Sequence, residues 1–273
     1  MKVILSRKGF DSGYGGWPSP VLPDGTMLSL PIPVTDQAIK YSDLVHNGVK
    51  YSDIIRDLMG ETIKVEGEGS FDLDDITCHL DPDIRKDVFV RKDGWKGIFG
   101  QNGAPFTHLS NQKVGKGDLF LYFGWFRKTI YDGAKLKYDP QCKGFHAIYG
   151  YLQVNQIKNI RDNDFEEWAL YHPHVRRGKE ASKFDHLYYA SDQLTFLESK
   201  KGFGVFEFSD RVILTKDGRA KSRWELPTFF KRYQISYHTE NSWKDDYFQS
   251  AAKGQEFVVH ADDEIVKWVK SLF

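Results

Sequence analysis

Two stretches of the chain, both rich in aromatic and β-branched residues, most constrain its fold. They read VGKGDLFLYFGWFRKT, residues 114–129, and FHAIYGYLQVNQIKNI, residues 145–160, and turn-forming residues bound each of them. Aromatic and β-branched side chains pack well on the pleated surface of a sheet, and such runs between turns are typical of strands. The two stretches therefore predict two β-strands.

Helical signals are fewer. The C-terminal segment ADDEIVKWVKSLF has apolar residues at i, i+3, i+4 and i+7 behind Asp262 or Asp263, and this pattern predicts a capped helix. Two further short helices are predicted, one capped by Thr35 or Asp36 and the other by Ser52 or Asp53, and the second has an apolar stripe facing the core.

The segment GFGVFEFSDRVILT, residues 202–215, predicts a β-hairpin that turns at Ser209 and Asp210. No linker or low-complexity tract divides the chain. We therefore predict a single domain over residues 1–273 of the α+β class, with a mixed, β-rich core and peripheral helices.

Charge and cysteine content exclude several classes of protein. Lys and Arg number 38 and so do Asp and Glu, so any contact with DNA needs a local basic patch. Two cysteines are too few for a disulfide scaffold or a cysteine-rich zinc site. The apolar run in MKVILSRKGF is too short for a signal peptide, and no run is long enough to span a bilayer. The sequence predicts a cytoplasmic protein without membrane contact.

The first predicted strand ends in SRKGFD, which brings two cations, a glycine and a carboxylate together. Arg7 and Lys8 can hold a phosphate, and Gly9 lets the backbone approach it. Asp11 is then a candidate acid, base or ribose ligand, and Tyr14 in the proline-stiffened loop is a candidate stacking ring. The alternative is an internal salt bridge that braces the loop, although exposed pairs contribute only about 0–1 kcal/mol.

The segment CHLDPDIR places Cys78 next to His79. A thiol and an imidazole can form a nucleophile pair, but neighbouring residues on a strand point to opposite faces, which makes them poor partners. Both remain candidate catalytic residues. The Asp81-Pro82 step in the same segment is interpreted as a structural turn.

The segment HPHV places His172 and His174 on one side of an extended chain. A metal site here would need a third ligand, such as His186 or His146, and no recognised zinc spacing is present. We therefore predict no metal ligands and no cofactor. Contacts of the two imidazoles with a phosphate or a base are the preferred interpretation, with basic residues following just behind.

The segment GWKGIFGQNGAPFTHLSN, residues 94–111, is predicted to form a glycine-rich loop. It offers Gln101 and Asn102 to read a base edge, His108 for acid–base chemistry, and Trp95 to stack. Trp125 is a further candidate stacking ring. The alternative is that the amides only satisfy the backbone of a buried polar loop.

Several blocks together resemble a known family. In chain order they are ILSRKGFDSGYGGWPSPVLPDGTMLSLPIP, CHLDPDIR, FGQNGAPFTHL, VGKGDLFLYFGWFR, HAIYGYLQV, HPHV and GQEFVV. They resemble the nucleotide modification associated domain family, type three, also described as a DNA base hypermodification protein. The resemblance implies membership in bacterial and phage systems that alter DNA bases, with a part in phage defence, and it supplies no catalytic residues.

The blocks GDLFLYFGWFR and HAIYGYLQV separately resemble the core of PUA-like folds, including ASCH and EVE domains. The pseudobarrels of those domains hold RNA segments or flipped modified bases. The alternative is an ordinary antiparallel pair within a β-rich core.

Three functions follow as hypotheses. The preferred one is an enzyme that modifies a nucleobase in DNA or in its nucleotide precursor, with DNA or a nucleotide as its partner. The second is a reader that binds a modified, flipped base without chemistry, and needs no group with a perturbed pKa. The third is a subunit that works with other DNA-modification proteins.

Overall fold

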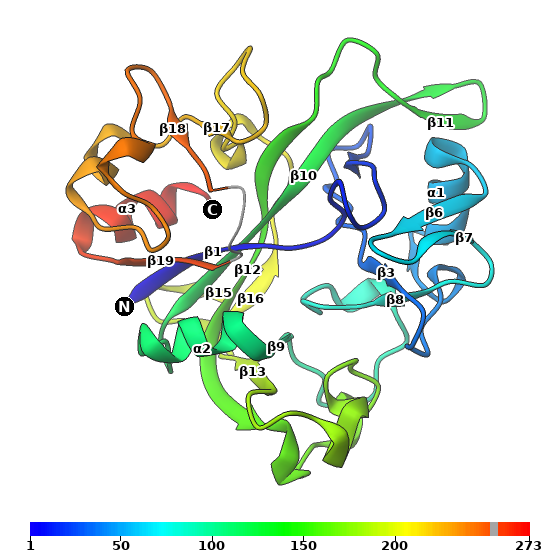
Figure 1. The fold of residues 1–273 in the computed structure, drawn as a ribbon, viewed down its shortest axis with the longest axis horizontal. Coiled ribbons are helices and arrows are strands. Elements are labelled where there is room, and N and C mark those ends of the chain that lie inside the picture. The colour runs from blue at the N-terminus through cyan, green and yellow to red at the C-terminus, as the bar shows by residue number, and fades with distance from the viewer. Residues whose placement is uncertain (252–255) are drawn as a thin grey trace.

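The computed structural model describes residues 1–251 and 256–273. Its centre is a large mixed sheet that contains two long neighbouring strands (Figure 1). The main path of the sheet runs β19 (Glu256–His260), β1 (Lys2–Arg7), β10 (Leu119–Asp132), β12 (Phe145–Asn159), β13 (His186–Ala190) and β9 (Ile98–Gln101). Three further strands join it from the side: β2 (Ser19–Val21), β11 (Lys135–Tyr138) and β16 (Phe203–Val205). The fold is therefore α+β, as the sequence predicts.

The two predicted strands are confirmed as β10 and β12. They pair antiparallel from Leu119 opposite Gln153 to Phe126 opposite Phe145. β1 lies parallel to β10 on the other side, and its residues from Val3 to Ser6 are buried. Aromatic side chains of this central trio pack on one another, for example Tyr122 of β10 against Tyr149 of β12 with ring centroids 6.4 Å apart.

Five two-stranded sheets surround the central sheet in the described part of the chain. They pair β3 (Ile32–Val34) with β8 (Thr77–His79), β4 (Val45–His46) with β5 (Val49–Lys50), β6 (Thr62–Val65) with β7 (Gly69–Asp72), β14 (Gln193–Leu194) with β15 (Leu197–Lys201), and β17 (Arg223–Trp224) with β18 (Phe248–Gln249). The α-helices are α1 (Tyr51–Met59), α2 (Gly103–Asn111) and α3 (Asp263–Ser271). Among the described residues, no helix has the length and apolar character that a membrane crossing requires.

Two of the three predicted helices are confirmed, whereas no α-helix begins at Thr35 or Asp36 and only a 3-10 turn follows at Tyr41–Asp43. α3 is capped by Asp262, whose carboxylate accepts hydrogen bonds from the backbone N–H groups of Glu264 and Ile265. α1 begins at Tyr51, close to the predicted start, and it buries Ile54 and Ile55.

Two further local predictions are wrong. No hairpin forms over residues 202–215, because Phe203–Val205 pairs with the long strand β12 and Asp210–Val212 forms a single 3-10 turn. The predicted loop 94–111 contains β9 and α2 instead. Pro105 does not prevent α2, because it lies in the first helical turn, where its missing N–H costs no hydrogen bond.

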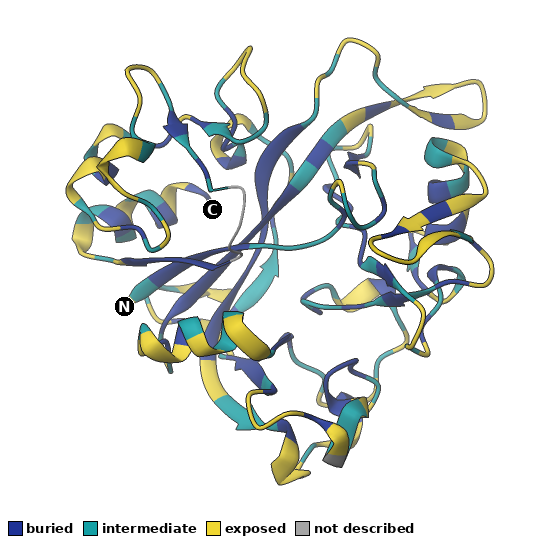
Figure 2. Ribbon diagram, in the orientation of Figure 1, coloured by how far each residue is buried: buried dark blue, intermediate teal, exposed yellow. Residues whose placement is uncertain are grey.

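The first strand links two hydrophobic clusters. Figure 2 shows that most of the strand is buried. Val3, Ile4 and Leu5 belong to the large cluster around the central sheet, whereas Phe10 belongs to a second cluster that also contains residues of α1, β6 and β8. The chain therefore passes from one cluster to the other at residues 7–9. The cationic segment is fixed at both of its ends, because Lys8 N–H bonds to the Phe123 carbonyl and Phe10 N–H to the Leu30 carbonyl.

Candidate functional site

A cleft of about 380 Å³ lies where the first strand leaves the central sheet. It is bordered by the ends of β1, β8 and β9 and by the segment that precedes the 3-10 helix Val175–Glu180. Eight of the predicted site residues line it: Arg7, Lys8, Asp11, Tyr14, His79, Gln101, Asn102 and His174. Residues from four distant parts of the sequence thus come together in one place.

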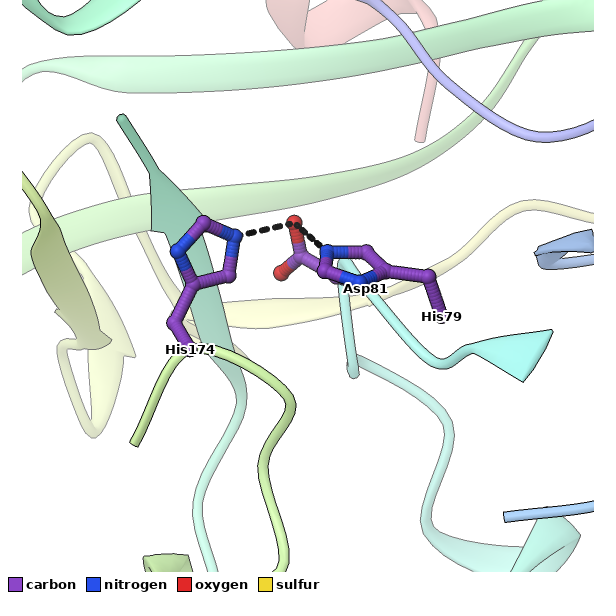
Figure 3. A group of neighbouring side chains, drawn as sticks. All are labelled: His79, Asp81 and His174. Carbon is purple, nitrogen blue, oxygen red and sulfur yellow. Dashed lines mark ion pairs between the residues drawn. The ribbon is translucent and has the colours of Figure 1, made fainter. Parts of the chain in front are cut away.

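A cluster of three potential ligand side chains, His79, Asp81 and His174, forms part of the cleft wall (Figure 3). Asp81 Oδ2 lies 4.0 Å from His79 Nε2 and 3.9 Å from His174 Nε2. The three ligand atoms all lie within 4.8 Å of one another, and such a group could hold a metal ion. The sequence predicts no metal ligands because no recognised zinc spacing is present and Asp81 is interpreted as a turn residue.

The Asp81 carboxylate is fixed through its other oxygen. Oδ1 accepts a hydrogen bond of 2.7 Å from the Gly100 N–H and lies 3.2 Å from His172 Nε2. Burial alone raises the pKa of Asp81, but the hydrogen bond from His172 and the neighbouring imidazoles outweigh burial and lower the pKa to about 2. Asp81 is therefore a carboxylate at neutral pH, with Oδ2 directed at His79 and His174.

The His174 ring is held from behind. Its Nδ1 lies 2.5 Å from Asp185 Oδ1, and the other oxygen of Asp185 accepts a hydrogen bond of 3.1 Å from Arg177. These hydrogen bonds lower the pKa of Asp185 although burial opposes them. Gly100 makes room for the ring, because a Cβ there would come within 2.1 Å of His174 Cδ2. His174 Nε2 is thereby directed toward Asp81.

Cys78 and His79 have opposite surroundings, as the alternation of a strand requires. His79 faces the cleft, and burial lowers its pKa to about 3, so its imidazole is neutral at pH 7. Cys78 points into the second hydrophobic cluster, and burial raises the pKa of its thiol. The assignment of Cys78 as a catalytic nucleophile is therefore corrected, since a buried thiol outside the cleft meets no substrate and forms little thiolate.

Both predicted cations lie in the cleft lining. Arg7 lines the cleft together with Arg177. Lys8 also lines it, but its Nζ lies 3.1 Å from Glu256 Oε1, and only 11% of its side chain is exposed. The salt-bridge alternative thus applies to Lys8, with Glu256 of β19 rather than Asp11 as its partner.

The polar groups around the cations are partly used within the fold. Gln101 donates its amide to Glu256 Oε1 at 2.6 Å and accepts from the Asn102 N–H, so it braces the cleft floor. Asp11 accepts from the N–H groups of Gly13 and Tyr14 through Oδ1, which closes the turn that carries Tyr14.

Besides Cys78, four predicted residues lie outside the cleft lining, and each has a structural partner. Trp95 donates to the Tyr171 hydroxyl, and Lys221 lies over the Trp125 ring. His108 is on α2, 3.0 Å from Ser236 Oγ. His172 is fully buried behind Asp81 and contacts that carboxylate instead of a ligand. The assigned stacking, acid–base and binding roles are corrected for these four, because their rings are packed or paired within the fold.

Neither suggested third ligand joins the cluster. His146 accepts a hydrogen bond from Trp224 Nε1 in the core, and His186 stacks on Phe106. Sequence reasoning missed Asp81 and Arg177 as cleft residues. The spacing His79-Leu80-Asp81 held a usable signal, because alternate residues of an extended chain face the same side.

A larger hollow of about 900 Å³ lies elsewhere on the molecule, and none of the predicted site residues lines it. Basic and acidic side chains alternate around it, for example Lys216 beside Asp217 and Arg219. The smaller cleft is therefore the better candidate site, because it gathers cations, imidazoles and a carboxylate of lowered pKa.

These features define an α+β protein with a polar cleft at the end of its first strand. The model of the family described as Nucleotide modification associated domain 3 matches residues 2–260, and the chain belongs to this family. The resemblance predicted from the sequence is thereby confirmed, and the family name implies a role in nucleotide modification. No curated protein and no solved structure matches the chain, so the PUA-like resemblance of β10 and β12 stays a prediction.

Proposed function

We propose that the protein is an enzyme that modifies a nucleobase, in DNA or in its nucleotide precursor, within the cleft at the end of β1. The observation that carries this proposal is the chemistry of the cleft lining, which combines cations, an amide, an aromatic ring, carboxylates and imidazoles. A nucleotide has a part that suits each of these groups. The family's association with nucleotide modification supports the same class of substrate.

Arg7 and Arg177 are proposed to bind the phosphate, because a guanidinium matches phosphate oxygens with two parallel N–H donors. Asn102 can donate and accept at a base edge, and Tyr14 can stack on the base. A cleft of about 380 Å³ falls in the range of small-molecule sites, which fits a single nucleotide or one flipped base.

An enzyme is preferred over a reader because two titratable groups in the cleft have shifted pKa values. A reader needs stacking and hydrogen bonds alone, whereas His79 and Asp81 have strongly lowered pKa values beside each other. Asp11 lines the same cleft and is the proposed acid–base group, because the turn that its Oδ1 closes holds the carboxylate in place there.

The test is mass spectrometry of nucleosides from cells that carry the natural gene, cells that lack it, and cells complemented with variants. We expect a nucleoside of altered mass, in DNA or in the nucleotide pool, that disappears with the gene. The wild-type chain should restore it and Asp11→Asn should not. Asparagine keeps the Oδ1 acceptor for the turn but cannot take up a proton.

Asp24→Asn is the matched control, because Asp24 closes a similar turn through Thr26 N–H and lies outside the cleft. It should restore the nucleoside fully. Identical nucleosides with and without the gene would refute the proposed enzyme. Selective binding of modified DNA by the same protein would then favour the reader.

A further inference from the structure

We propose that His79, Asp81 and His174 bind a divalent first-row transition metal ion through His79 Nε2, Asp81 Oδ2 and His174 Nε2. The inference goes beyond the proposed function, because metal binding by these side chains does not require that the substrate be a nucleotide. It also reverses the expectation drawn from the sequence, which found no third ligand for the HPHV histidines.

The spacing of the three ligand atoms fits a metal site better than a hydrogen-bonded cluster. The two imidazole nitrogens lie 3.9 and 4.0 Å from Asp81 Oδ2, which is beyond hydrogen-bond distance. Ligands of a tetrahedral zinc ion with bonds of about 2.1 Å lie about 3.4 Å apart. Small side-chain rotations toward a common centre therefore suffice to complete the coordination. Figure 3 shows the two imidazoles on either side of the carboxylate.

A second layer of contacts fixes two of the ligands. Asp185 lies 2.5 Å from His174 Nδ1, and this contact fixes the ring with Nε2 toward the cluster. A carboxylate behind the second nitrogen is the usual support of a metal-binding histidine. Asp81 is held in the same way through Oδ1 by the Gly100 N–H and His172, which leaves Oδ2 toward the imidazoles.

The ligand types determine which ion fits. Two imidazole nitrogens and one carboxylate oxygen suit zinc, iron, cobalt or nickel, whereas Mg²⁺ and Ca²⁺ prefer oxygen ligands alone. Three protein ligands leave at least one coordination position for water or substrate. Since all three side chains line the cleft, that position faces the space in which a substrate would bind.

The experiment is calorimetric titration of the full chain with ZnCl₂ after removal of metals with a chelator. We expect one tightly bound zinc ion per chain and no binding of MgCl₂ in the same assay. His79→Ala, His174→Ala and Asp81→Asn should each weaken zinc binding at least about 100-fold. Asp185→Asn, which alters only a positioning residue, should weaken it about 10- to 100-fold.

His186→Ala is the matched control, because His186 stacks on Phe106 outside the cluster, and its zinc affinity should equal that of the wild type. Cobalt(II) provides a second readout, since its visible absorption reports the ligands and should be lost in His79→Ala. Thermal unfolding in chelator identifies any variant that fails to fold, and the remaining ligand variants then decide the outcome.

Equal zinc affinity in the wild type and in folded His79→Ala or Asp81→Asn would overturn the inference. The result is distinct from that of the nucleoside experiment. Zinc binding together with unchanged nucleosides would refute the proposed enzyme and support the metal site. Altered nucleosides without zinc binding would support the enzyme and refute the metal site.

Discussion

Two buried carboxylates, Asp81 and Asp83, lie two residues apart and have very different surroundings. Each is contacted by side chains from the same distant segment, Asp81 by His172 and Asp83 by Tyr171. Each side chain is at most 4% exposed. The contrast between them separates a structural polar cluster from a candidate site.

Asp83 is fully paired. Arg91 donates to both of its oxygens, at 2.6 and 2.5 Å, while the Tyr171 hydroxyl and Trp95 Nε1 donate to Oδ2. The guanidinium is always charged, so the pair is neutral overall at every physiological pH. All of its partners are fixed within the fold, and Asp83 therefore holds its neighbours in place.

Asp81 is paired on one side only. Its Oδ1 is held by Gly100 and His172, but its Oδ2 faces two imidazoles at distances longer than hydrogen bonds. The imidazoles carry no permanent charge, and the group lines a cleft. Asp83 stabilises the fold, whereas Asp81 is arranged to interact with something that enters the cleft.

The largest expected effect on the free energy of unfolding comes from removing the charge of Asp83. Asp83→Asn leaves the buried Arg91 without its counter-charge, and breaking a buried pair in this way costs about 3–5 kcal/mol. Urea unfolding of the wild type and the variant measures the loss. Zinc affinity should stay unchanged in the folded variant, because Asp83 is not a ligand. A loss of stability below about 1 kcal/mol would show that the Asp83 cluster is not structural.

The second effect concerns His146, whose Nδ1 already has a hydrogen-bond partner within the fold. His146 and His79 both have a pKa lowered to about 3, chiefly by burial. His146 Nδ1, however, accepts a hydrogen bond of 3.1 Å from Trp224 Nε1, which only the unprotonated nitrogen can do. His146 should therefore act on stability alone.

The sign of its pH effect follows from linkage. The unfolded chain binds a proton at His146 near pH 6.5 and the folded chain near pH 3, so this contribution to stability is complete above pH 6.5 and is lost as the pH falls. At pH 5 the loss is about 2 kcal/mol. Unfolding at pH 7 and pH 5 in chelator should show a pH dependence smaller by that amount in His146→Asn, which keeps an acceptor for Trp224.

The exposed His260 supplies the control, because His260→Asn makes the same change on the surface and leaves the contact of His146 with Trp224 in place. A pH dependence in His146→Asn equal to that of the wild type would contradict the structural assignment of His146.

The sequence predicted what local patterns determine. The strands β10 and β12, the helix cap at Asp262 and the opposite orientations of Cys78 and His79 all follow from period and propensity within a few residues. The cationic end of β1 was also found, because a strand end and its charges are neighbours in the chain.

Long-range partners could not be predicted. Asp81 and Asp83 belong to one LDPD turn motif, and partners outside the motif distinguish them. Asp81 contacts His172, 91 positions away, whereas Asp83 pairs with Arg91 and Tyr171, 8 and 88 positions away. Lys8 looked like a phosphate ligand, yet its partner Glu256 lies 248 positions away. The group of His79, Asp81 and His174 was missed for the same reason. Asp81 was interpreted as a turn residue, and His174 lies far from it in the sequence.

The smallest expected effect on stability is also the sharpest test of the comparison. Asp81→Asn makes the same change as Asp83→Asn two residues away, but asparagine still offers an oxygen to the Gly100 N–H, and no permanent cation is left unpaired. Measured in chelator, the free energy of unfolding should fall by no more than about 2 kcal/mol, the amount at pH 7 that corresponds to an Asp81 pKa lowered to about 2. Zinc binding should nevertheless be lost. If Asp81→Asn instead destabilised the protein as much as Asp83→Asn, both carboxylates would be structural. The hydrogen-bond partners of the two carboxylates would then not identify the functional site.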